Sequence, residues 1–200
     1  MFSGFFQRLR YGEPVVVVSG LPRSGTSMLM AMLEAGGLPL LTDEKRHADP
    51  DNPRGYFEME SVKSLGEQPD KAWVRNARGK GLKVISYLLK ELPDDNAYRV
   101  LFARRDLAEV IRSQNVMLER QQQPNPVDDA KALDLFRKHL VNVQLLMRSK
   151  RNFRMLEVAH REALADPQRT AAAINAFLGG RLDVDRMAAV VDRGLYRNRG

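Results

Sequence analysis

The chain has no cysteine and a single tryptophan among its 200 residues. Without cysteine it can form neither a disulfide nor a thiolate metal site, which suits a reducing compartment. No uninterrupted apolar run approaches the ~18 residues of a transmembrane helix. The first ten residues also lack the long apolar stretch and the small-residue cleavage site of a signal peptide. We therefore expect a cytoplasmic protein with no membrane span.

Acidic residues are fewer than basic ones. The chain carries 25 Asp and Glu against 32 Lys and Arg, a formal net charge of +7. Such an excess can serve nucleic acid, an anionic membrane or a multiply charged substrate. Basic residues are not interleaved with aromatic ones, and no helix-turn-helix or RNA-binding signature is present, so we expect no nucleic-acid partner. An arginine-rich surface explains most of the excess.

The most informative segment runs from Val15 to Ser27. Its four consecutive valines predict a buried parallel strand, the residues from Gly20 to Gly25 a tight loop, and the apolar spacing from Thr26 a helix. Strand, loop and helix in this order direct backbone N–H groups at a phosphate-like anion. The glycine spacing matches a Walker A loop, but Thr26 stands where that loop needs lysine. The nearby cation is Arg23, which argues against an ordinary ATPase or GTPase.

Residues 22–27 read P-R-S-G-T-S, which resembles the 5′-phosphosulfate loop of sulfotransferases. These enzymes use the donor PAPS (3′-phosphoadenosine 5′-phosphosulfate). The resemblance implies that Arg23 contacts the bridging oxygen and the leaving phosphate. It also implies no metal, and it implies that the 5′-phosphate is bound by backbone N–H groups and hydroxyls of Ser24, Gly25, Thr26 and Ser27.

A second motif follows the expected strand Tyr98–Ala103. Sulfotransferases bind the 3′-phosphate of the donor with an arginine at a strand end and a serine eight residues later, and Arg105 and Ser113 have this spacing. Glu109 stands where the family usually has an acidic residue, whereas Leu107 replaces a common proline. An arginine offers a bidentate, permanently charged fork to a phosphate.

Two further segments extend the resemblance over nearly the whole chain. Residues 51–58, D-N-P-R-G-Y-F-E, are similar to the N-P-x-G-[YF]-x-E signature of small bacterial sulfotransferase-like proteins. Residues 165–179 contain D-P and F-L-G in the family's order.

Four residues at three places in the sequence are candidates for the catalytic base. In the tyrosylprotein branch of the family the basic glutamate follows the second strand, and the matching position here is Asp43, with Glu44 adjacent. Glu58 is the second candidate and His47 the third, because the ordinary pKa of histidine suits a base. Each has a structural alternative: Asp43 and Glu44 as capping or surface carboxylates, Glu58 as an arginine partner, and His47 as a solvated loop residue.

The pattern of elements predicts one α/β domain over residues 1–200, a P-loop-type parallel β-sheet flanked by helices. Residues 43–80 are expected to form an insertion that carries acceptor loops. The strands expected are Pro14–Ser19, Leu38–Thr42, Leu82–Ser86, Tyr98–Ala103 and Phe153–Val158. We expect a first helix that begins at Thr26 and ends at Ala35. The other main helices are expected over Asp106–Gln121, Asp128–Arg151, Ala171–Leu178 and Asp185–Val191. Gly36-Gly37 is expected to cap the first helix.

The sequence thus favours a PAPS-dependent sulfotransferase that acts on a hydroxyl or amine acceptor, with PAP as the product. Two alternatives remain open: a P-loop nucleotide or small-molecule kinase, and a non-catalytic PAP(S)-binding protein. Trp73 can stack on a ligand or pack in the core. The basic tail Arg193–Arg199 can fold onto the 3′-phosphate or fray. The acceptor and the oligomeric state are not predicted.

Overall fold

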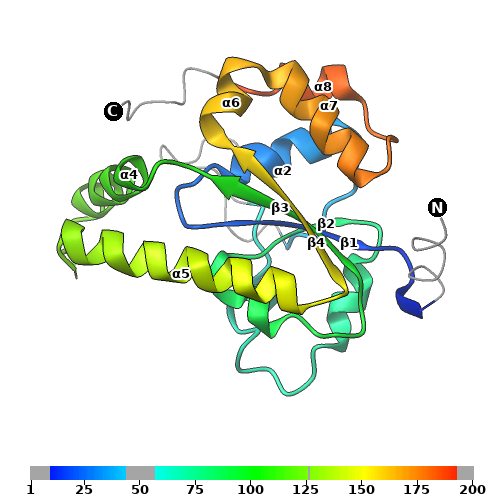
Figure 1. The fold of residues 1–200 in the computed structure, drawn as a ribbon, viewed down its shortest axis with the longest axis horizontal. Coiled ribbons are helices and arrows are strands. Elements are labelled where there is room, and N and C mark those ends of the chain that lie inside the picture. Colours follow the sequence, from blue (N-terminus) through cyan, green and yellow to red (C-terminus); the bar gives the residue numbers. More distant parts are fainter. Residues whose placement is uncertain (1–9, 44–56, 126, 193–200) are drawn as a thin grey trace.

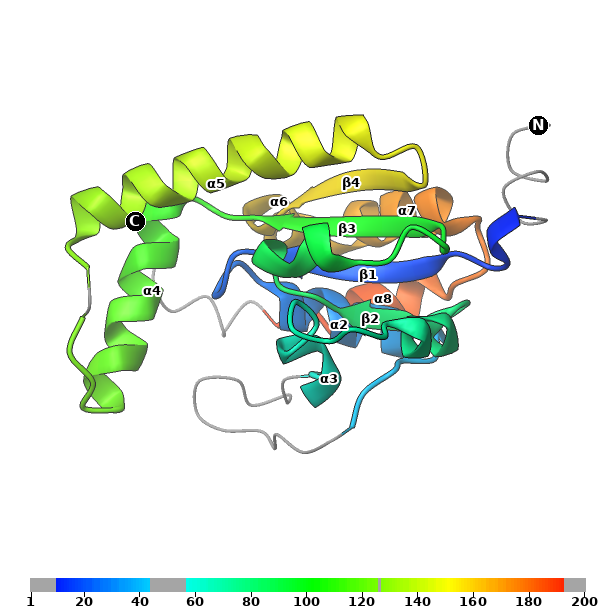
Figure 2. The same cartoon turned by 90° about the horizontal axis from the view of Figure 1, so that it is seen from below.

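A computed structural model describes residues 10–43, 57–125 and 127–192. Its centre is a four-stranded parallel sheet in the order β2-β1-β3-β4 (Figure 2). The strands are β1 (Val15–Gly20), β2 (Gly81–Lys83), β3 (Tyr98–Arg104) and β4 (Phe153–Ala159). The helices are α2 (Thr26–Ala35), α3 (Glu60–Lys63), η1 (Ala72–Ala77), η2 (Ser86–Glu91), α4 (Leu107–Arg120), α5 (Asp129–Ser149), α6 (His160–Ala165), α7 (Pro167–Leu178) and α8 (Val184–Ala189).

Both faces of the sheet are covered, which explains why β1 is apolar without alternation. Successive strand residues point to opposite faces. Val15 and Val17 join a core cluster with residues of η1, η2 and α5, whereas Val16 and Val18 join a second cluster with residues of α2, α7 and α8. Figure 1 shows α5 on one side of the sheet and α2, α6, α7 and α8 on the other. The expected α/β architecture is confirmed.

Capping residues expected from the sequence are found at the end of α2 and at the start of α4. After α2, the N–H of Gly37 bonds the carbonyl of Glu34 and the N–H of Leu38 bonds that of Leu33, with Gly37 at φ 90°. This is a Schellman motif, which needs a residue that tolerates positive φ. The side chain of Asp106 caps α4 through the N–H groups of Ala108 and Glu109.

The expected strand Leu38–Thr42 is wrong. Only an isolated parallel bridge joins Leu40 to Gly81. Pro39 has no N–H to donate, and β2 is only three residues long, so the ladder cannot extend. The expected strand Leu82–Ser86 likewise shortens to β2, and Ser86 begins η2.

The apolar stripe of α5 is buried over only part of its length. Val143 is buried, and Leu140 and Met147 pack against the first cluster. Leu133 and Phe136, which helical spacing puts on the same face, belong to neither cluster. The N-terminal half of α5 extends with α4 past the sheet, so this part of the stripe has no strand beneath it (Figure 2).

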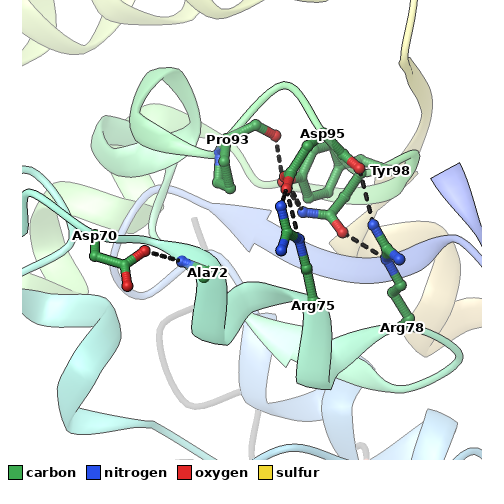
Figure 3. Close-up of polar contacts among 8 residues, drawn as sticks. Asp70, Ala72, Arg75, Arg78, Pro93, Asp95 and Tyr98 are labelled. Atoms are coloured by element: carbon green, nitrogen blue, oxygen red, sulfur yellow. Dashed lines mark hydrogen bonds and ion pairs between the residues drawn. The ribbon is translucent and has the colours of Figure 1, made fainter.

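Polar side chains tie η1 to the turn before β3, at the amino ends of the strands (Figure 3). Arg75 Nε donates to Asp95 Oδ2 at 2.7 Å, and Arg78 donates to the side chain of Asn96 and the carbonyl of Asp95. The buried Tyr98 hydroxyl donates to the carbonyl of Pro93. This network satisfies the polar groups of the turn and positions the start of β3.

A truncation in the second cluster tests the role of α2. Leu33 is 0% exposed, so Leu33→Ala is expected to lower the free energy of unfolding by about 2–5 kcal/mol. Leu145→Ala on α5, where the side chain is 56% exposed, is the matched control and should change it by less than about 0.5 kcal/mol. Urea unfolding followed by circular dichroism measures both, and equal effects would contradict the core assignment.

Candidate active site

The loop between β1 and α2 is held in one conformation by its own contacts. The hydroxyl and the N–H of Ser24 both donate to the carbonyl of Leu21, at 2.7 and 3.2 Å. A Cβ at Gly20 would lie 2.4 Å from Ser24 Oγ and 2.9 Å from the carbonyl oxygen of Ala103, so only glycine fits. Arg23 has φ 67°, a left-handed conformation that costs a non-glycine residue about 1–3 kcal/mol. Strain of this kind is typical of functional loops.

The N-terminus of α2 opens onto this loop. Gly25 precedes the helix with φ 102°, and the first helical bond runs from the N–H of Leu29 to its carbonyl. The N–H groups of the first helical turn, including those of Thr26 and Ser27, therefore have no acceptor within the helix. These donors and the helix dipole favour an anion at this position.

The two arginine motifs meet in space. Arg105 NH1 donates to the carbonyl oxygen of Arg23 at 3.0 Å, and Arg23 Nε donates to Ser113 Oγ at 3.1 Å. Arg23 follows β1 and Arg105 follows β3. Ser113 lies in α4, the helix that begins just after Arg105. The adjacent parallel strands thus bring together three residues that the sequence pattern had linked only by resemblance.

A buried carboxylate anchors this group. Glu109 is 2% exposed, and its Oε2 accepts from Arg105 Nε at 3.0 Å. Its Oε1 accepts from Arg161 NH2 at 2.9 Å. Arg161 was not singled out by the sequence analysis, because nothing in its local context links it to Glu109.

A second missed residue is Lys83 at the end of β2. Its side chain is 8% exposed, and its Nζ donates to Ser27 Oγ at 3.1 Å. Glu58 Oε1 lies 3.8 Å from the same nitrogen, and Glu58 Oε2 lies 3.8 Å from Lys63 Nζ. Glu58 is therefore linked through Lys83 to the loop. A lone lysine in a short strand gives no sequence signal, because the position of that strand beside β1 is a tertiary feature.

The other candidates for the catalytic base are not connected to the loop in this way or lie outside the described residues. Asp43 Oδ2 accepts from the N–H of Glu60 at 2.6 Å, so its carboxylate caps the first turn of α3. Glu44 and His47 lie outside the described residues, as do most of the 51–58 motif and the tail Arg193–Arg199. Trp73 packs against the first core cluster and donates to Gln68 Oε1 at 2.6 Å, which supports the packing interpretation.

His160 is a third site residue that the sequence analysis missed. It follows β4, and its ring lies against the loop: a Cβ at Gly25 would be 2.6 Å from His160 Cδ2. Burial, and then the positive charge of Arg105, lower the pKa of His160 to about 4, while Glu109 opposes this shift. The imidazole is therefore neutral near pH 7 and adds no charge to the arginines around it.

Within the residues that the structure describes, no group of three or more His, Asp or Glu side chains could hold a metal ion. In the same part of the chain, no helix is both long and apolar enough for a bilayer.

The low pKa of His160 predicts a loss of stability in acid. The unfolded chain protonates this group near pH 6.5 and the native state near pH 4, so the unfolded state binds more protons between these values. The free energy of unfolding should fall as the pH decreases through this window, by up to about 1.4 kcal/mol per pH unit from this group. His160→Phe should show a shallower fall in urea unfolding, and parallel curves for the two proteins would contradict the assignment.

Comparisons with known proteins bear on the fold. No protein-family model and no curated protein matches the sequence. Among solved structures, the sulfotransferase domain of the Synechococcus PCC 7002 olefin synthase is similar, with a TM-score of 0.59 and 19% identity over 96% of this chain and 82% of that one. A sulfotransferase domain from the curacin biosynthetic pathway matches with a TM-score of 0.49 and 11% identity over 90% and 83%. The first likeness shows that this chain has the α/β fold of a sulfotransferase domain.

Proposed function

We propose that this protein is a sulfotransferase that moves a sulfuryl group from PAPS to a hydroxyl or amine acceptor. The observation that carries the proposal is the contact between the two arginine motifs, from Arg105 to the Arg23 carbonyl and from Arg23 to Ser113. A donor with phosphate groups at both its 5′ and its 3′ position needs two anion sites a short distance apart. The loop with the α2 N-terminus offers one, and Arg105 with Ser113 offers the other.

PAPS fits the positive charge and the hydrogen-bond donors of this region. The N–H groups of Gly25, Thr26 and Ser27 suit the oxygens of the 5′-phosphosulfate. The hydroxyl of Ser24 serves the loop itself in the present structure, since it donates to Leu21. Arg105 donates to Glu109 and to the carbonyl of Arg23, which fixes its guanidinium at the carboxyl end of β3. A guanidinium is a planar fork of N–H donors that suits a phosphate.

The transfer step needs charge stabilisation and one proton acceptor. The acceptor oxygen or nitrogen attacks sulfur, and the bond between sulfur and the bridging oxygen breaks. The electron pair of that bond stays on the 5′-phosphate of PAP, where the guanidinium of Arg23 stabilises it. Lys83, which touches the loop through Ser27, stabilises the charge on the sulfuryl oxygens. The acceptor proton goes to a carboxylate.

Glu58 is the carboxylate that we favour as this base. It is connected to the loop through Lys83, whereas the carboxylate of Asp43 is engaged with the N-terminus of α3. Lys83 Nζ and Lys63 Nζ each lie 3.8 Å from one of its carboxylate oxygens, so Glu58 stands between two cations. Glu44 remains a candidate from the sequence only.

The acceptor is expected to meet the residues that follow Lys83. Ile85 and Tyr87 are each 42% exposed, and the Tyr87 ring stacks on His139 at 3.8 Å between centroids. His139 Nε2 and Ser86 Oγ are 2.8 Å apart. Ile85, Ser86 and Tyr87 follow Lys83 within four residues at the carboxyl end of β2. A cytoplasmic location and the absence of a nucleic-acid partner remain predictions from the sequence.

Binding of PAP tests the donor and separates the alternatives. In calorimetric titration the protein should bind PAP more tightly than ATP with Mg²⁺. Arg105→Ala should weaken PAP binding about 10- to 100-fold, because it removes a charge-assisted hydrogen bond. Circular dichroism checks that the variant is folded. Tighter binding of ATP–Mg²⁺ than of PAP would favour the kinase alternative instead.

The base is tested by a matched pair of glutamate variants. Glu58→Gln should lower the rate of PAP release from PAPS, with a panel of phenol, sugar and amine acceptors, by about 10²- to 10⁴-fold. Its affinity for PAP should be nearly unchanged. Glu60→Gln, two residues further on at an exposed position of α3, should keep the wild-type rate. PAP binding without turnover of any acceptor by the wild-type protein would favour the non-catalytic alternative.

A further inference from the structure

Glu109 joins two arginines rather than one. Its two carboxylate oxygens accept from Arg105 Nε at 3.0 Å and from Arg161 NH2 at 2.9 Å. Because both guanidiniums bond the same carboxylate, they lie within a few ångströms of one another. One buried negative charge therefore holds two positive groups together at the carboxyl ends of β3 and β4.

Arg161 differs from Arg105 in its exposure. The side chain of Arg105 is 10% exposed, whereas that of Arg161 is 69% exposed. Arg105 already neutralises Glu109, so a second arginine is not needed for that role. Arg161 instead keeps most of its surface toward solvent while the bond to Glu109 fixes its direction.

The residue before Arg161 contacts the loop between β1 and α2. His160 packs on the backbone of Gly25, and its pKa responds to both Arg105 and Glu109. Two contacts therefore hold Arg161 at the site: the packing of His160, its neighbour in the sequence, and its own bond to Glu109. Arg105, Arg161 and Glu109 together carry one net positive charge, which favours a phosphate anion beside them.

We propose that Arg161 is a second guanidinium for the 3′-phosphate of the donor, held in place by Glu109 beside Arg105. This assignment rests on the proposed function, because it needs a nucleotide that carries a 3′-phosphate. Arg161 then contributes to selection between PAP and nucleotides without that group, and Glu109 acts as the positioning residue for both arginines.

The experiment compares PAP with AMP, which lacks the 3′-phosphate. Arg161→Gln removes the guanidinium and its charge from a side chain that is 69% exposed, and Glu109 keeps its bond to Arg105, so the fold is preserved. The variant should bind PAP about 10-fold more weakly than wild type and bind AMP within about twofold of wild type. Arg75→Gln is the control, since Arg75 is also an exposed, ion-paired arginine but lies at the amino ends of the strands. It should change neither affinity.

A double variant separates contact from positioning. If Arg161 touches the phosphate, Arg161→Gln should weaken PAP binding also in an Arg105→Ala background, by more than about threefold. No further loss in that background would show that Arg161 acts only through Arg105 and would overturn the proposal. An unchanged preference for PAP over AMP in the single variant would overturn it as well. Wild-type protein that does not bind PAP would instead overturn the proposed function together with this assignment.

Discussion

The common edge formed by the carboxyl ends of the parallel strands is the constraint on which the site depends. β1, β3 and β4 run in register, with Gly20 opposite Ala103 and Arg104 opposite Ala159. Residues that directly follow these strands must therefore lie close together. This places Arg23, Arg105 and the His160–Arg161 pair around one point, and β2 adds Lys83 from the other side of β1. Ligands of open α/β sheets bind at this edge.

Two carboxylates make this concentration of cations tolerable in the absence of a ligand. Glu109 lies between Arg105 and Arg161, and Glu58 lies between Lys63 and Lys83. Repulsion among the cations would otherwise spread them apart. Each carboxylate contacts two cationic side chains without cancelling the positive excess, so contacts within the protein hold these cations in place. Such preorganisation is the main way in which a protein stabilises charge in a transition state.

Some elements follow from local chemistry, and these were predicted well. The buried strand of valines, the helix from Thr26, the glycine cap at Gly37 and the Asp106 cap each depend on residues within a few positions. The strand expected at Leu38–Thr42 failed because its pairing depended on a distant partner of only three residues. The apolar stripe of α5 was correctly identified as helical, but its burial depended on how far the helix extends past the sheet.

The sequence by itself determined the loop between β1 and α2, the Arg105 and Ser113 spacing and the alternation of strands with helices, because each is a pattern of neighbouring residues. Only the tertiary structure decided which of the remaining polar residues join them. Lys83 ends β2, whereas His160 and Arg161 begin α6, and these two segments come together near the loop because the strand order is β2-β1-β3-β4. Asp43 and Glu58 are both candidates for the base in the sequence. The fold directs one to the end of α3 and the other to Lys83, since side-chain direction is set by packing between distant segments.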